Sequence, residues 1–152
     1  MAKKFHRHDV PTITGSRYPA PFHEPCVARA RQRLGDAGGL TQFGVNLLRL
    51  APGAWSSQRH WHSGEDEFVY VLEGEVVLVT DSGEELVRSG DCAGFKAGEA
   101  NGHHLKNSSG SDALILEIGS RRSEDEVIYP DIDLHVPKRE NGFTHKNGEP
   151  YA

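Results

Sequence analysis

The stretch His60-Trp61-His62, followed by Glu67 and the apolar run 68–72 (Phe-Val-Tyr-Val-Leu), says most about this chain. Side chains at positions i and i+2 of a β-strand point to the same face, so His60 and His62 project together and Trp61 projects away. After a turn-rich break, Glu67 opens a second strand, from which it can face the same pocket. Two imidazoles and one carboxylate are the donors of open metal sites such as non-haem iron or catalytic zinc. Because three inward donors are costly to bury without a counter-ion, the pattern predicts a divalent metal site.

These residues resemble the first motif of the cupin superfamily: a glycine, then His-x-His, then a glutamate, then a second glycine. The motif is matched by Gly53, His60, His62, Glu67 and Gly74. The resemblance covers about residues 40 to 120. It implies a small, single-domain cupin in which the histidines and the glutamate hold one metal ion.

The second cupin motif is matched by Gly90, Gly98, His103 and Asn107. It departs from the family pattern in two places. Lys96 stands where the family has proline, and about two extra residues precede the histidine. Either His103 or His104 can therefore be the fourth ligand. We prefer His103 because only His103 keeps the spacing to Asn107, and Asn101 is a weaker candidate.

The chain from Leu40 onward reads as a succession of short strands with Gly, Asp and Ser turns between them, which is typical of a sandwich or barrel. The strands expected are 41–50, 58–62, 67–73, 75–80, 84–87, 91–96, 103–107 and 113–118. The resemblance implies a jelly roll. We therefore predict an all-β, single-domain jelly-roll barrel (double-stranded β-helix).

The predicted organisation has three parts: an N-terminal arm (1–39), the barrel core (40–119) and a C-terminal tail (120–152) that packs on the barrel or on a partner subunit. Prolines forbid a long helix in the first part of the arm. The segment 26–34 is the best helix candidate, ended by Gly35. It fits a strand equally well, because its arginines alternate with period two.

Composition bounds the partners and the compartment. A chain of 152 residues is most simply one domain. Its net charge of −5 is spread along the sequence, which argues against nucleic acid as a partner. There is no apolar run long enough to cross a membrane and no signal region, so a cytoplasmic location is the default. Cys26 and Cys92 show no CxxC pattern and are expected as thiols. The resemblance implies a homodimer.

Proton-transfer chemistry needs a base besides the metal ligands. Gln58 shares the face of His60 and His62 by alternation, so we expect it to point into the pocket and contact substrate. His104 and Glu99 are the other candidates.

Four further residues carry open alternatives. Glu65 belongs to a solvated turn, or replaces Glu67 as a donor. Asn107 is a hydrogen-bonding strand residue, or it orients a ligand. Arg49, if inward, anchors an anion, and Lys96 could do so at the mouth. No Arg/Lys cluster adjoins the motifs, so the sequence offers no clear phosphate cradle.

The first function that we consider is a metal-dependent enzyme acting on a small polar metabolite, specifically a sugar or sugar-phosphate isomerase or epimerase. Lyase chemistry is also compatible with the resemblance. The alternatives are an iron-dependent dioxygenase and a non-catalytic cupin that binds or senses a small ligand. The donor set suits zinc, iron, manganese, nickel or copper, and it does not choose among them.

Overall fold

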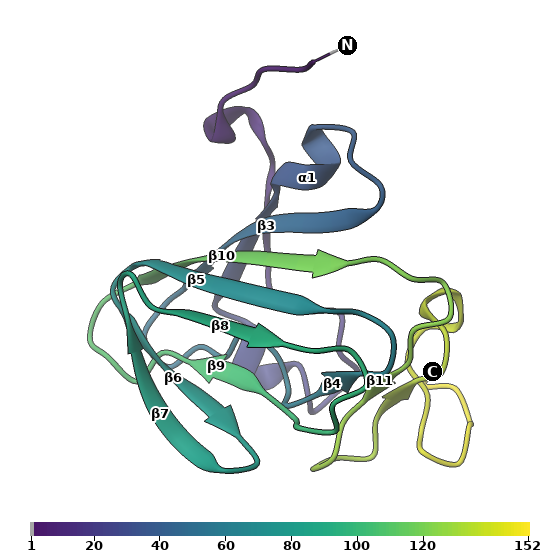
Figure 1. The fold of residues 1–152 in the computed structure, drawn as a ribbon. Helices are drawn as coiled ribbons and strands as arrows, with labels where there is room; N and C mark the ends of the chain where they lie inside the picture. Colours follow the sequence, from purple (N-terminus) through teal and green to yellow (C-terminus); the bar gives the residue numbers. More distant parts are fainter. Residues whose placement is uncertain (1) are drawn as a thin grey trace.

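The computed structural model describes residues 2–152 and shows the predicted all-β jelly roll (Figure 1). Its strands are β1 (Thr12–Thr14), β2 (Arg29–Arg33), β3 (Phe43–Leu50), β4 (Trp61–His62), β5 (Glu67–Glu73), β6 (Glu75–Thr80), β7 (Gly83–Arg88), β8 (Cys92–Phe95), β9 (His104–Lys106), β10 (Ala113–Ser120), β11 (Val127–Ile128) and β12 (His135–Val136). Within the described residues, helical structure is limited to α1 (Leu34–Ala37) and the 3-10 turns η1 (Arg7–Asp9), η2 (Glu24–Cys26) and η3 (Arg139–Asn141). In residues 2–152 no helix has the length and apolar character needed to cross a membrane.

The strands form three antiparallel sheets. The largest has the order β1-β2-β3-β10-β5-β8, and the smaller ones have the orders β12-β11-β4 and β7-β6-β9. Figure 1 shows β3, β10, β5 and β8 side by side, with β6, β7 and β9 lying across from them. The large sheet and the β7-β6-β9 sheet form two walls that enclose one apolar core. Its fully buried side chains include Leu48, Leu50, Val71 and Ile115.

The turn between β5 and β6 requires a glycine. Gly74 has a φ of +79°, a left-handed conformation that side chains with a Cβ rarely adopt. A Cβ at this position would also lie 2.8 Å from the carbonyl oxygen of Asp112. The last glycine of the first motif is therefore fixed by backbone geometry, and it lets β5 turn directly into β6.

The segment expected as an arm adds two strands to the large sheet. The best helix candidate, 26–34, was wrong as a helix: Arg29–Arg33 is β2, paired with β3, and only α1 after it is helical. Alternation of the arginines with Ala30 and Gln32 suits a strand with one face turned to a polar cavity. The sheet therefore extends beyond the boundary expected at residue 40.

The tail folds back over the barrel of its own chain. Its strand β11 pairs with β4, placing Val127 opposite His62. Arg59 donates to both carboxylate oxygens of Asp131 and also pairs with Asp81, so it fastens the tail to the barrel wall. The apolar tail residue Leu134 is fully buried. The tail consequently reaches the region that holds the His-x-His motif.

Candidate metal centre

Backbone pairing brings the motif residues together. His60 and His103 exchange two backbone hydrogen bonds, of 3.1 and 2.8 Å, which set the two histidines side by side. His62 lies in β4, and Glu67 is the first residue of β5. Four side chains from two distant parts of the sequence thus converge on one point.

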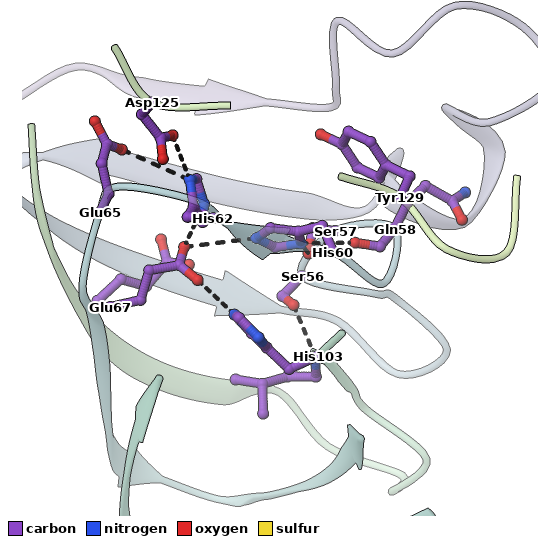
Figure 2. Close-up of polar contacts among 12 residues, drawn as sticks. Ser56, Ser57, Gln58, His60, His62, Glu65, Glu67, His103, Asp125 and Tyr129 are labelled. Atoms are coloured by element: carbon purple, nitrogen blue, oxygen red, sulfur yellow. Dashed lines mark hydrogen bonds and ion pairs between the residues drawn. The ribbon is translucent and has the colours of Figure 1, made fainter. Parts of the chain in front are cut away.

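Glu67 stands at the centre of the cluster (Figure 2). Its Oε1 lies 3.1 Å from Nε2 of His62 and 3.5 Å from Nε2 of His60. Its other oxygen, Oε2, makes a short hydrogen bond with Nε2 of His103. All three imidazoles therefore present the same ring nitrogen, Nε2, to one carboxylate.

The opposite ring nitrogens are held by oxygen acceptors. Nδ1 of His60 lies 2.8 Å from the carbonyl oxygen of Gln58, and Nδ1 of His62 lies 2.7 Å from Oδ2 of Asp125. Nδ1 of His103 lies 3.3 Å from the carbonyl oxygen of Asn101. Because these oxygens can only accept, a singly protonated ring that keeps this contact carries its proton on Nδ1, which leaves Nε2 free to bind a metal. This arrangement fixes the rings and turns Nε2 inward, as in protein metal sites.

The charges in the cluster are strongly coupled. Burial alone would raise the pKa of Glu67, but the facing imidazoles hold that pKa well below its usual value. Burial lowers the pKa of His62, yet hydrogen bonds with Asp125 and Glu67 outweigh it and raise the pKa to about 10. Burial also lowers the pKa of His103. In this metal-free arrangement a proton on His62 supplies positive charge between two carboxylates.

The donor set fits a divalent cation. One donor atom from each of His60, His62 and Glu67 lies within 4.8 Å of the others, and His103 contacts the same carboxylate. Imidazole and carboxylate donors suit transition metals and zinc. The cluster opens into a cavity of about 940 Å³, which is large enough for a small metabolite.

Gln58 does not behave as expected from strand alternation. The regular strand β4 contains only Trp61 and His62, so the period-two rule does not extend back to Gln58. Its side chain is buried, and its Nε2 donates to the carbonyl oxygen of Phe22 at 2.8 Å. What serves the centre is its backbone, through the carbonyl oxygen bound to His60.

The structure separates the two adjacent histidines. His103 contacts Glu67, whereas the ring of His104 packs edge-on against Trp55 with a centroid separation of 4.6 Å. Nδ1 of His104 lies 2.8 Å from the carbonyl oxygen of Ser57. His103, and not His104, therefore lies at the cluster, and its role as the fourth donor stays a prediction.

For two other residues the structure favours the structural alternative over the functional one. Asn107 is fully buried, and its side-chain amide donates to the carbonyl oxygens of Leu50 and Ser111, so it stabilises a loop. Arg49 points to the outer side and pairs with Asp112 at 3.6 Å. Arg49 therefore does not point inward, and it does not anchor an anion in the cavity.

Glu65 is not the solvated residue that its turn-rich surroundings suggest. Its side chain is 4% exposed, and it accepts hydrogen bonds from Arg139 and from the backbone N–H of Arg122. Both partners come from the tail. Lys96, Glu99 and Asn101 line a small cavity of about 40 Å³ that also borders Glu67.

Sequence reasoning missed the residues outside the motifs that reach the centre or line its cavity. Asp125 and Tyr129 come from the tail, and Arg29 and Arg31 come from β2. The ring of Tyr129 lies 5.8 Å from that of His60. The alternating arginines were visible in the sequence, but nothing local placed their strand in the cavity wall.

Comparison with known proteins agrees with this geometry. Residues 46–119 match the model of the cupin domain family. A solved sugar phosphate isomerase of the cupin superfamily, from Silicibacter pomeroyi, is 45% identical over 99% of this chain and 97% of its own, with a TM-score of 0.92. The chain belongs to the cupin superfamily. No curated protein matches this cupin in sequence.

Two further solved structures extend the comparison. A candidate sugar phosphate isomerase from Acidithiobacillus ferrooxidans is 32% identical to this cupin and covers 76% of it and 74% of its own chain, with a TM-score of 0.71. A polyketide cyclase from Streptomyces resistomycificus is 25% identical over 87% of each chain, with a TM-score of 0.67. The alignment with the Acidithiobacillus ferrooxidans protein leaves about a quarter of each chain unmatched.

Proposed function

We propose that this cupin is a metal-dependent isomerase of a phosphorylated sugar. The observation that carries the proposal is the cluster of His60, His62, Glu67 and His103, which faces a cavity of about 940 Å³ with Nε2 of each ring turned inward. The similarity to the sugar phosphate isomerase from Silicibacter pomeroyi, along almost the whole chain, supports this substrate class.

Each part of the chain has a role in such a reaction. The four clustered side chains would hold one divalent ion, which supplies Lewis acidity toward a carbonyl or hydroxyl oxygen of the sugar. Tyr129 and Tyr18 line the same cavity, and their hydroxyls lie 3.5 Å apart. Burial raises the pKa of both groups, so both remain neutral and can donate hydrogen bonds to sugar oxygens.

The proposal is tested by proton exchange. An isomerase that works through an enediol removes the proton next to the sugar carbonyl, so incubation in D₂O should place deuterium at that carbon. We expect exchange with at least one member of a panel of aldose and ketose phosphates, read by proton NMR. The metal-loaded Glu67→Gln variant is the control and should exchange far more slowly.

Other outcomes would direct attention to the alternative functions. Oxygen consumption by an iron-loaded sample would favour a dioxygenase. A ligand that raises the melting temperature and is recovered unchanged would favour a binding or sensing cupin. Absence of both deuterium exchange and conversion to an isomer across the whole panel, in protein with one equivalent of each candidate metal, would contradict the isomerase proposal.

We also propose a cytoplasmic homodimer. The outer face of β5 exposes a row of apolar side chains, Phe68, Tyr70 and Leu72, each more than a third exposed. Cys26 and Cys92 are both free thiols, in keeping with a reducing compartment. Light scattering at micromolar concentration should give twice the chain mass, and a monomer would contradict the dimer.

A further inference from the structure

The arginines of β2 lie on the inner face of the large sheet. Arg29 is paired with Leu50, and Arg31 is paired with Leu48. Directly opposite residues of an antiparallel pair share a face. Both leucines are fully buried in the core, so both arginines point to the inside of the barrel.

A third arginine continues this row toward the cavity rim. Arg33 is paired with Asn46, and its side chain is exposed. Together with Arg29 and Arg31 it lines the cavity of about 940 Å³ that contains the metal ligands. Period-two alternation in one strand thus places three guanidinium groups along one wall.

The charges in this wall are only partly balanced. Arg31 makes a two-bonded pair with Glu117, at 2.8 and 3.2 Å. Arg29 instead donates to two backbone carbonyls, those of Gly15 and Ser56, and across residues 2–152 it has no ion pair with a carboxylate. Carbonyl oxygens fix the direction of a guanidinium but do not neutralise it. Burial, followed by the charge of Arg31, lowers the pKa of Arg29, as expected for a cation without a counter-ion.

The arginine row and the metal ligands occupy separate parts of the same cavity. Glu67 belongs to β5, and β3 and β10 lie between β5 and β2. In the pairing register Glu67 lies level with Gly44, two residues from the partner of Arg33 and six from the partner of Arg29, so the two groups are also offset along the strands. Two tyrosine rings bridge the space between them: the Tyr129 ring lies 5.8 Å from His60 and 5.9 Å from the Tyr18 ring, and the Arg29 guanidinium lies 5.7 Å from the Tyr18 ring. A ligand with an oxygen at the metal ligands would therefore extend its far end toward Arg29.

We propose that Arg29, Arg31 and Arg33 form the binding site for the phosphate group of the substrate. Planar guanidinium groups match the oxygen geometry of phosphate and bind it with paired hydrogen bonds. Two of the three lack a carboxylate partner within the described residues, so a doubly charged phosphate completes the charge balance. This assignment rests on the proposed function for the identity of the sugar, but phosphate binding itself can be measured without it.

The direct test titrates inorganic phosphate into the metal-free full-length protein by calorimetry at fixed ionic strength. Removing the metal prevents phosphate from binding there. We expect saturable binding that weakens tenfold or more in Arg29→Met, because charge-assisted hydrogen bonds are lost. Arg29→Lys keeps the charge and should weaken binding less. The matched control is Arg49→Met, on the outer side of the neighbouring strand, which should bind phosphate as the wild type does.

Two further variants guard against a folding defect. Arg33→Met changes an exposed side chain and should weaken phosphate binding several-fold without changing the melting temperature. Glu117→Gln removes the carboxylate that partners Arg31 and should tighten binding. The proposal would be overturned if the wild type showed no saturable phosphate binding. It would also be overturned if folded Arg29→Met and Arg33→Met bound phosphate as tightly as the wild type. Acetate binding as tight as phosphate would overturn the choice of phosphate.

Kinetics separates this proposal from the proposed function. If a sugar phosphate is turned over, Arg29→Met should raise its KM much more than it changes kcat, while the bound metal remains at one equivalent. Turnover with an unchanged KM would overturn the phosphate site and leave the isomerase proposal intact. Phosphate binding that depends on Arg29, in a protein that turns over no sugar phosphate, would keep the site and remove the isomerase.

Discussion

Nδ1 of His62 lies 2.7 Å from Oδ2 of Asp125, a residue 63 positions later in the chain. The other carboxylate oxygen of Asp125 accepts from the backbone N–H of Gly64 at 2.9 Å, so the carboxylate is itself held in place. Asp125 is 3% exposed. The tail therefore contributes the group that orients one of the proposed metal ligands, as Figure 2 shows.

The first prediction concerns this contact. Asp125→Asn should weaken metal binding about 10- to 100-fold, because loss of such an orienting carboxylate lowers ligand basicity and frees the ring. Competition with a chelator of known affinity measures the change. The control is Asp133→Asn, an exposed tail carboxylate that binds His145 instead. Equal affinities for Asp125→Asn and the wild type would show that Asp125 does not orient the ligand.

The second prediction concerns protons. The pKa of His62 is about 10 in the metal-free cluster, above its usual value of 6.5, so His62 is protonated at neutral pH. Metal binding at Nε2 must displace that proton, and the apparent affinity should rise with pH until about pH 10. Calorimetry at pH 7 in buffers of different ionisation enthalpy counts the protons released. A count of zero would mean that His62 is either neutral beforehand or not a ligand.

The barrel could be predicted from the sequence, but only part of the residues that line its cavity could. Period-two patterns and glycine turns placed β5 and β6 at the expected residues, because both strands have one buried face. The His-x-His spacing found the candidate metal ligands, because His60, an extended bridge residue just before β4, and His62 in β4 both turn toward Glu67. The prediction that the Gln58 side chain points into the pocket was wrong, because residue 58 lies in an irregular segment before β4 and alternation holds only for extended chain.

Contacts made by distant segments could not be predicted in the same way. Asp125 lies in a polar stretch with no periodicity, and only the pairing of β11 with β4 brings it to His62. Glu65 looked like a turn residue because its burial depends on Arg139, far along the tail. The arginines of β2 form a pattern that fits a strand, but the cavity they face is built by other strands.

The third prediction concerns the core. Leu48 is fully buried between the two walls, so Leu48→Ala should lower the free energy of unfolding by about 2–5 kcal/mol. Leu86 is 42% exposed on β7, and Leu86→Ala should change that free energy much less. Denaturant melts of the two variants and the wild type give both values. Similar losses in the two variants would place the core elsewhere.

The fourth prediction separates strain from collision at the motif glycine. Gly74 and Gly90 both have positive φ, at 79° and 94°, but only at Gly74 would an added Cβ collide with a backbone oxygen. Gly90→Ala should cost about 1 kcal/mol for the left-handed backbone alone. Gly74→Ala should cost distinctly more, because the β5–β6 turn must shift. Equal losses of unfolding free energy would mean that the turn accommodates the methyl group freely.

The most direct test of the metal-centre account is elemental analysis of tag-free protein beside a His60→Ala/His103→Ala double variant. We expect about one equivalent of a divalent metal in the wild type and loss of that metal in the double variant, with the fold retained by circular dichroism. A wild-type protein that takes up no metal after reconstitution with zinc, iron, manganese, nickel or copper in turn would contradict it.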